Sequence, residues 1–334
     1  MKATSLAYPL VVVLTSVLCS CADILVPEGA SELNLQDFEA AWRFADEYYP
    51  FFTFKNVNWD SLRVAFEPRA ACARGDELYP LLFALFVPLR DGHIEVQSEA
   101  GYPMVNYRPP RAGDARAFDP VLLRKYFPKP LSVVGENKIE LGLLDEAVGY
   151  IRFSTFAKGD WVREVDEPLE RLLHTLGLIV DVRNNTGGSG KTYGYILPRL
   201  IDRPVVETAY YWDGSVRSGT IQPAARHYTG KLVVLINGAS FSAAEVFTEL
   251  LRQLPSVTVV GDTSGGGGGD TELFVLPSGK KLRLPVKYFR RHDGEMIEWN
   301  GVIPDVVVEQ SVTDILRQRD LQLEKAIVLA RKGL

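Results

Sequence analysis

Four short runs of aliphatic and β-branched residues most constrain how the second half of this 334-residue chain can fold. They read VGYIRF, GLIVDVR, KLVVLIN and VTVVGD and begin at residues 148, 177, 231 and 257. The last three are almost continuously apolar, which is typical of strands with both faces buried. Two stretches with helical character, REVDEPLERLLHTL and SAAEVFTELLRQL, separate the runs. Because strands and helices alternate in this way, the sequence predicts an α/β fold.

The segments before this core have different patterns. Residues 35–100 carry aromatic and aliphatic residues at three-to-four spacing and predict a small N-terminal helical domain. Residues 101–146 contain several prolines and predict a linker or strap, and residues 22–34 predict a tether. The core then occupies residues 147–334, with a hairpin at FVLPSGKKLRLPV and one long final helix at TDILRQRDLQLEKAIVLARKG.

The first 21 residues have the pattern of an export signal. A single lysine precedes an apolar run from Ala7 to Leu18, which at about 1.5 Å per residue is too short to cross a bilayer of about 30 Å. A buried N-terminal strand or short helix is the alternative. The segment LCSC looks like a bacterial lipobox, and this resemblance implies cleavage before Cys21, a lipid anchor on Cys21 and a place in the bacterial cell envelope. Cys72 then has no partner for an intramolecular disulfide and is expected to be a buried structural cysteine, with a catalytic thiol as the alternative.

Composition and charge exclude several classes of protein. Hydrophobic residues make up 46% of the chain and charged residues 24%, which is ordinary for a globular protein and excludes a disordered or polytopic membrane protein. A net charge of -5 and a pI of about 5.6 argue against a general nucleic-acid binder, which needs a basic surface. The four histidines lack metal-ligand spacing and no cofactor motif is present, so neither a metal nor a cofactor is expected.

A sharp turn of small residues follows the third apolar run. Asn237 ends the run, and a helix is expected to start near Ser242. A serine hydroxyl at a helix N-terminus faces free N–H groups and the positive end of the helix dipole, which suits a nucleophile whose attack creates an oxyanion. The alternative is a helix cap, because Ser242 followed three residues later by Glu245 also forms a capping box.

Three further segments carry residue types used in catalysis. The run from Asp181 to Gly188 ends in two glycines, which can present bare N–H groups to a ligand. The alternative is that this segment is a polar turn with no ligand. His93 follows Arg-Asp-Gly and is a candidate general base, or a structural histidine. Glu298 precedes a glycine turn and could orient that histidine, or lie on the surface.

Taken in order, these segments resemble the S41 peptidases, the family of C-terminal processing and tricorn core proteases. The resemblance extends from about residue 35 to residue 310 through NVNWDSLRVAF, LRDGHIEV, VGYIRFSTF, LIVDVRNNTGG, VVLINGASFSAAEVF, VVGDTSGG and NGVIPDVVVE. It implies a ClpP/crotonase-like superhelix of ββα units as the core. Many members also carry a PDZ domain, and residues 101–146 are too few to form one.

The resemblance places the nucleophile and the oxyanion hole. The family's serine precedes the glutamate of its SxSxxE-type turn by three residues, which corresponds to Ser242 and not Ser240. The family's oxyanion hole combines an amide from the paired glycines with the amide after the serine. These positions correspond to Gly187 or Gly188 and to Ala243.

The residue available as general base differs from that used in one branch of the family. Processing proteases use a lysine on the loop after the VVGE-type strand, and no lysine occurs here between residues 232 and 279, which excludes that dyad. The tricorn-like branch uses a histidine backed by a glutamate, and His93 and Glu298 match those positions. That branch also has a serine just before the histidine, where this chain has Gly92. Asp91 could therefore orient His93, or Glu298 could contact it directly.

The sequence thus predicts a serine endopeptidase with peptide or protein substrates, membrane attachment through its lipid, and no nucleic-acid partner. Ser242 would form the acyl-enzyme, His93 would act as general base, and the amides of Gly188 and Ala243 would hold the oxyanion. A catalytically inactive peptide-binding lipoprotein on the same scaffold and an esterase are the alternatives. The five glycines of Gly265–Gly269 lie next to this site and predict either a mobile flap or a flexible connection.

Overall fold

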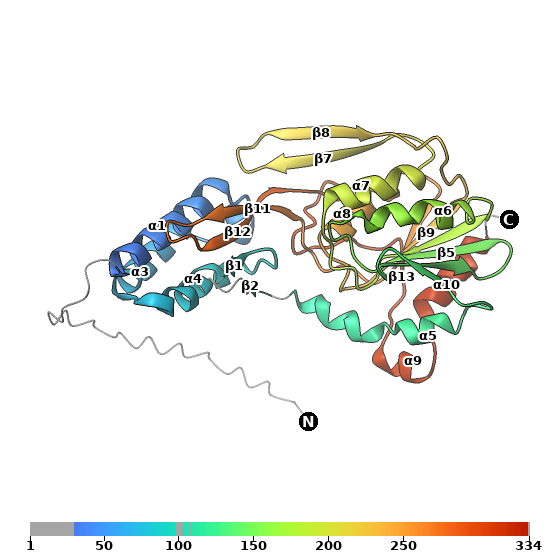
Figure 1. Ribbon diagram of the computed structural model, residues 1–334, viewed down its shortest axis with the longest axis horizontal. Helices are drawn as coiled ribbons and strands as arrows, with labels where there is room; N and C mark the ends of the chain where they lie inside the picture. Colours follow the sequence, from blue (N-terminus) through green and yellow to red (C-terminus); the bar gives the residue numbers. More distant parts are fainter. Residues whose placement is uncertain (1–29, 98–102, 106, 108, 333–334) are drawn as a thin grey trace, which may run out of the picture.

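The apolar runs of the core lie side by side in one sheet of the computed structural model, which describes residues 30–97, 103–105, 107 and 109–332 (Figure 1). The seven strands of this sheet, in spatial order, are β13 (Val306–Val307), β10 (Val257–Gly261), β9 (Lys231–Ile236), β6 (Gly177–Asp181), β5 (Val148–Phe153), β4 (Ile139–Leu143) and β3 (Ser132–Val134). The first five are parallel neighbours, and β4 and β3 extend the sheet in antiparallel fashion. The predicted α/β class is confirmed.

Helices cover both faces of this sheet, which is why its central strands are apolar throughout. Ile179 and Val233 face one layer, where they pack against the last helix, and Val180 and Val234 face the opposite layer. The helices of the core are α5 (Pro120–Arg124), α6 (Asp166–Glu170), α7 (Gly190–Ile196), α8 (Ala243–Arg252), α9 (Val312–Leu316) and α10 (Leu321–Arg331). We call this unit the core lobe.

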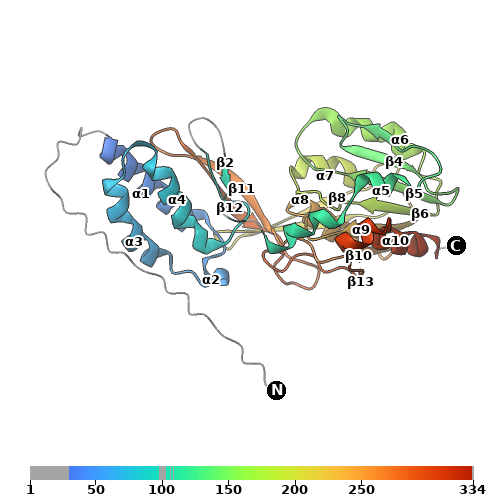
Figure 2. The same ribbon diagram turned by 90° about the horizontal axis from the view of Figure 1, so that it is seen from below.

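A second unit, the helical lobe, lies beside the core lobe (Figures 1 and 2). Its helices and short strands are α1 (Ala30–Tyr48), α2 (Phe52–Lys55), α3 (Trp59–Cys72), α4 (Leu78–Phe86), β1 (Glu95–Gln97) and β2 (Pro103–Val105). The hairpin of β11 (Gly269–Val275) and β12 (Lys281–Tyr288) leaves the core lobe and packs on these helices. Leu276, Leu282 and Leu284 of the hairpin are buried together with Phe38 and Leu82. The predicted hairpin is therefore present, and it completes the helical lobe.

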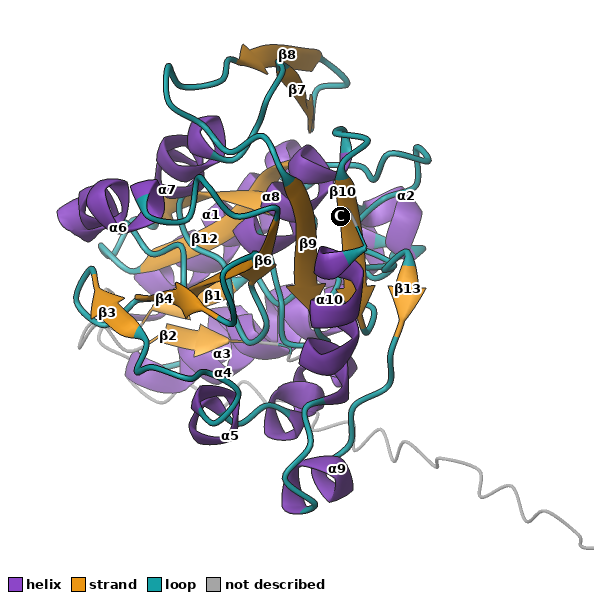
Figure 3. Cartoon of the chain, turned by 90° about the vertical axis from the view of Figure 1, so that its right-hand side faces the viewer, coloured by secondary structure: helices purple, strands orange, loops and turns teal. Residues whose placement is uncertain are grey.

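One antiparallel sheet connects the two lobes. Its order is β2-β1-β12-β7-β8, and β11 pairs with the other side of β12. The start of β12 pairs with β1, and its end pairs with β7 (Val205–Tyr211). The last strand, β8 (Val216–Ile221), forms an outlying hairpin with β7 (Figure 3). Short 3₁₀ turns occupy Gly75–Glu77, Val87–Leu89, Pro110–Ala117, Asp160–Val165 and Leu197–Arg199.

Four local expectations differ from the structure. The first helix begins at Ala30, inside the segment expected to be a tether, and β3 and β4 lie inside the segment expected to be a linker. The long final helix is divided into α9, which ends at Leu316, and α10. Gln318, between them, has a φ of 60°, and the Asp320 side chain accepts a hydrogen bond from the amide of Leu323 at 2.9 Å, which caps α10. Cys72 ends α3 and is exposed instead of buried.

The expected export signal and Cys21 lie outside the described residues. Within the described part of the chain, every helix is too short or too polar to cross a membrane. The structure therefore leaves the lipid anchor as an expectation from the sequence.

Candidate active site

Ser242 stands at the turn between β9 and α8, as the residue that precedes the helix. Its φ of 57° and ψ of -121° lie in a region that residues with a side chain rarely occupy. The amide of Ser242 donates to the Glu245 carboxylate at 2.8 Å, and the Ser242 hydroxyl lies 2.8 Å from Nε2 of His93. Strained positions of this kind cluster at active sites, where the surrounding structure holds them in place.

His93 reaches Ser242 from the other lobe, on the loop that enters β1. Its main-chain N–H donates to Oδ1 of Asp91 at 2.9 Å, and its ring stacks on Phe241 with centroids 4.8 Å apart. Burial lowers the pKa of His93 below its usual 6.5, although the Asp91 charge opposes this shift. The imidazole is therefore neutral at neutral pH and can accept the serine proton.

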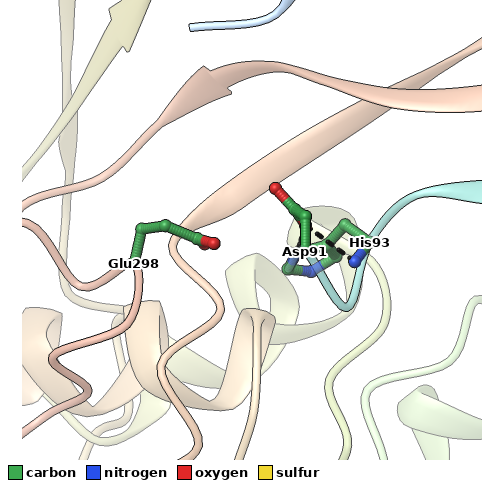
Figure 4. Close-up of side chains that lie close together, drawn as sticks. All are labelled: Asp91, His93 and Glu298. Carbon is green, nitrogen blue, oxygen red and sulfur yellow. Dashed lines mark hydrogen bonds and ion pairs between the residues drawn. The ribbon is translucent and has the colours of Figure 1, made fainter. Parts of the chain in front are cut away.

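Asp91 is the carboxylate nearest to the histidine ring, and both residues come from the same loop (Figure 4). Oδ1 of Asp91 lies 3.8 Å from Nδ1 of His93, and that nitrogen is buried with no hydrogen-bond partner among the described residues. Oδ2 of Asp91 accepts hydrogen bonds from the Tyr49 hydroxyl at 2.7 Å and from Nζ of Lys55 at 3.0 Å. Burial alone would raise the pKa of Asp91, but the charges of Lys55 and His93 outweigh it and hold the pKa below 3.8. Asp91 thus presents a negative charge to the imidazole.

Glu298 lies on the opposite side of this cluster (Figure 4). Its Oε1 accepts from Nζ of Lys55 at 2.6 Å, and its Oε2 accepts from the amide of Gly268 at 3.1 Å. Burial, with the nearby Asp91 charge, raises the pKa of Glu298 to about 8. Among the described residues it makes no hydrogen bond to His93. The structure therefore connects Glu298 to the histidine through Lys55 and Asp91, and Asp91 has the position expected of the orienting acid.

The same three side chains could be mistaken for a metal site. The ligand-type atoms of Asp91, His93 and Glu298 all lie within 4.8 Å of one another. The ammonium group of Lys55, however, already bonds to both carboxylates, and Nε2 of His93 faces the serine. A metal ion would have to displace a paired cation, so we interpret the cluster as an ion-pair network.

The paired glycines lie against the serine turn. The amide of Gly187 donates to the Asn185 side chain at 2.9 Å, which removes it from the expected oxyanion donors. Within the described part of the chain, the amides of Gly188 and Ala243 make no hydrogen bond. Ala243 directly follows Ser242, and Gly188 lines the same cleft as Ser242. A Cβ at Gly187 would come within 2.9 Å of the Ala243 nitrogen and 2.7 Å of the Ser242 Cβ. The space in front of the free amide exists because position 187 has no side chain.

Comparison with known proteins places this arrangement in a family. Residues 147–308 match the sequence profile of peptidase family S41, and residues 32–85 match that of the tricorn protease C1 domain. The core segment belongs to peptidase family S41. This confirms the resemblance seen in the motifs, and the serine, both paired glycines and Glu298 all lie within the S41 domain.

Relatives of the S41 domain include processing proteases. The chain is 31% identical over 195 residues to the carboxyl-terminal-processing protease of Synechocystis sp., and 26% identical over 205 residues to the carboxy-terminal processing protease CtpB of Bacillus subtilis. These alignments cover 57% and 59% of this chain and 45% and 41% of the relatives, so the chain spans less than half their length. A solved structure of a candidate peptidase from Parabacteroides merdae is 26% identical, with a TM-score of 0.75 over 90% of this chain and 96% of that one.

The glycine run of the S41 domain is buried and tightly packed against its neighbours. Gly265–Gly269 is buried, and the amides of Gly266 and Gly267 each donate to the Glu245 carboxylate at 2.8 Å. A Cβ at Gly267 would lie 2.2 Å from the Phe241 ring, so glycine there makes room for the ring that stacks on the histidine. A buried, hydrogen-bonded segment has neither the mobility of a flap nor that of a flexible connection.

A cleft of about 870 Å³ opens in front of the serine, between the two lobes. The helical lobe, with its hairpin, contributes His93, Glu95 and Arg283 to the lining of the cleft, and the core lobe contributes Gly188 and Ser242. The volume lies at the upper end of the range for sites that enclose a drug-sized ligand. The cleft can therefore admit several residues of an extended polypeptide.

Sequence reasoning missed three residues of this site. Phe241 supports the histidine ring, Glu245 ties the serine turn to the glycine run, and Lys55 bridges the two acids. Glu245 was expected as a capping residue, and its carboxylate does accept the amide of Ser242. No local pattern marks Lys55, because its two carboxylate partners lie 36 and 243 positions away in the chain.

Proposed function

We propose that this chain is a serine peptidase that hydrolyses peptide bonds in the cleft between its lobes. The observation that carries the proposal is the 2.8 Å contact between Nε2 of His93 and the hydroxyl of Ser242, which is held in a strained conformation at a helix N-terminus. Membership of the core in family S41 and its processing-protease relatives support peptides or proteins as substrates.

The reaction would proceed through an acyl-enzyme. His93 removes the hydroxyl proton of Ser242 through Nε2 while the serine oxygen attacks the carbonyl carbon of the scissile bond. The negative oxygen of the tetrahedral intermediate is held by the amides of Gly188 and Ala243. His93 then gives its proton to the leaving amine, and the carbon–nitrogen bond breaks. A water molecule then attacks the ester carbon while His93 takes a proton from it. The bond between that carbon and the Ser242 oxygen breaks as His93 gives the proton to that oxygen, which releases the carboxylic acid product and the free serine.

An active-site probe separates this proposal from a peptide-binding protein without activity. A fluorophosphonate should label the purified chain at Ser242, and label should be lost in Ser242→Ala and in His93→Ala. Ser218→Ala is the matched control, because Ser218 is exposed on β8 and bonds to Thr208. Unlabelled wild-type protein with a normal unfolding transition would contradict the proposal.

Comparison of substrates separates a peptidase from an esterase, since the nucleophile and oxyanion donors serve both reactions. Turnover of an unfolded protein such as casein should be lost in Ser242→Ala while the unfolding temperature stays within a few degrees of the wild type. Hydrolysis of simple esters with no cleavage of casein or of a mixed peptide library would favour the esterase.

We also propose that Cys21 carries a lipid that anchors the chain to the bacterial cell envelope. The support is the apolar run that ends in LCSC. In cells fed a labelled fatty acid, the wild-type chain should carry label and sediment with membranes, and Cys21→Ser should do neither. A wild-type chain without label would contradict the anchor and leave the peptidase proposal intact.

A further inference from the structure

Lys55 is a buried cation for which the proposed mechanism has no use. It is the last residue of the short helix α2, and its side chain is fully buried. The aromatic rings of Tyr49, Phe51 and Trp299 surround its ammonium group, with centroids 5.2 to 5.6 Å from Nζ. A lysine is almost never buried this deeply without a charged partner. The reason for its burial must lie in what its ammonium group contacts.

The ammonium group bonds to one acid from each lobe. It donates to Oδ2 of Asp91 at 3.0 Å, in the helical lobe, and to Oε1 of Glu298 at 2.6 Å, in the S41 domain. Asp91 in turn holds the main-chain N–H of His93, and Glu298 holds the amide of Gly268 in the buried glycine run. Lys55 thus stands at the middle of a chain of polar contacts from the base to the lobe that carries the serine.

Charge explains why this position needs a cation. Without Lys55, Asp91 would be a buried carboxylate with no cation bonded to it, beside a Glu298 whose raised pKa of about 8 keeps it protonated at neutral pH. Burial disfavours the charged form of such a group, so the pKa of Asp91 would rise and Asp91 would spend part of its time neutral. A neutral Asp91 cannot stabilise the imidazolium that forms when His93 takes the serine proton.

We propose that Lys55 is a positioning residue of the active site, which keeps Asp91 negatively charged toward His93 and fixes the helical lobe on the S41 domain through Glu298. The inference rests on the proposed peptidase function only for its effect on turnover. Its effect on the charge of Asp91 holds whether or not the chain cleaves peptides.

The groups that set these charges come from every element packed around the cluster. Asp91 faces Tyr49 at the end of α1, Lys55 on α2, Glu298 from the S41 domain, and His93 on its own loop. His93 is further influenced by Asp270 on β11 and Glu95 on β1. The Lys55 charge also lowers the pKa of His93 and of Glu298, so the effect of a Lys55 substitution on Asp91 has to be followed at the Asp91 carboxyl group itself.

The first experiment replaces the lysine with an uncharged chain of similar length. Lys55→Met should lower kcat about 100-fold, the lower end of what general-base catalysis contributes. KM should change less than about threefold, because Lys55 is not among the described residues that line the cleft. The acid limb of the kcat profile should move to higher pH, because Asp91 must then lose a proton to act. Lys138→Met is the matched control, since Lys138 also pairs with a carboxylate and lies over a tryptophan, but is not among the described residues that line the cleft.

A second substitution distinguishes charge from packing. In the double variant Lys55→Met/Asp91→Asn, the carboxylate through which Lys55 acts is already gone, so kcat should be no lower than in Asp91→Asn alone. If Lys55 only fills space, the loss caused by Lys55→Met should add to the loss caused by Asp91→Asn. If Lys55→Met does not fold, Tyr49→Phe removes another donor to Asp91 with little change in shape, and should move the acid limb in the same direction by less.

A readout without turnover keeps the inference separate from the proposed function. In protein with ¹³C-labelled aspartate carboxyls, assigned with Asp91→Asn, the Asp91 signal should stay that of a carboxylate from pH 5 to 8 in the wild type and titrate within that range in Lys55→Met. An unchanged Asp91 signal in Lys55→Met would overturn the inference. A changed signal in a chain that cleaves nothing would refute the peptidase and leave the role of Lys55 standing.

Discussion

Gly187→Ala tests the oxyanion site with a single methyl group. Gly187 has a φ of 93°, and a Cβ built there lies 2.7 Å from the carbonyl oxygen of Phe241, 2.7 Å from the Ser242 Cβ and 2.9 Å from the Ala243 nitrogen. All three distances are shorter than real Cβ contacts. The methyl group would therefore enter the space in front of the free Ala243 amide, where the oxyanion should form.

The expected magnitudes follow from these contacts. Loss of one oxyanion donor lowers kcat about 100- to 1000-fold. Stability should fall as well, because a side chain in the left-handed region costs about 1–2 kcal/mol and an overpacked methyl group costs about 1–3 kcal/mol. The kinetic loss should appear mainly in kcat, since the oxyanion exists only in the transition state and the intermediates that follow.

The assay compares Gly187→Ala with Gly194→Ala, at steady state and in urea unfolding. Gly194 lies within α7, where a Cβ would meet nothing within 4 Å, so alanine should raise stability by about 0.5–1 kcal/mol and leave kcat unchanged. Wild-type kcat in folded Gly187→Ala would refute the assignment of the Ala243 amide. An equal fall in kcat for both variants would show that the effect is not local.

Two further predictions concern pH and buried charge. Because burial lowers the pKa of His93 in the folded chain, the acid limb of the kcat/KM profile should lie below pH 6.5. The free energy of unfolding should also fall as the pH drops below 6.5, since the unfolded chain then binds more protons than the folded one. An acid limb above pH 6.5 would contradict this prediction. Arg183 is buried between Asp181 at 2.7 Å and Asp320 at 2.8 Å, so Arg183→Met should lower the free energy of unfolding in urea by about 3–5 kcal/mol. Arg171→Met, which removes an exposed ion pair, should change it by less than about 1 kcal/mol. Equal effects of the two substitutions would contradict the prediction.

The parts of the fold that local pattern controls could be predicted from the sequence. Strands β6, β9 and β10 of the large sheet are almost continuously apolar, because helices cover both of its faces, and together with β5 they occur where the pattern places them. Ser242 and His93 were paired by their resemblance to a family and not by spacing, since 149 positions separate them. Their contact depends on how the two lobes meet, which no local pattern expresses.

The missed features all depend on distant partners. The glycines of Gly265–Gly269 suggest flexibility when read alone, but in the fold the missing side chains make room for Phe241 and expose amides to Glu245. The β11–β12 hairpin was read as part of the core because it follows the core in sequence. Its leucines are instead buried against α1 and α4, which precede it by about 200 residues.

That hairpin has a consequence for the order in which the protein matures during synthesis. The helices that carry His93 emerge first from the ribosome, yet their apolar face stays uncovered until Leu282 and Leu284 have been made. His93 and Ser242 therefore cannot be held in their final positions in a nascent chain that ends before residue 288. Under the proposed function, a chain built this way would gain its activity only near the end of its synthesis.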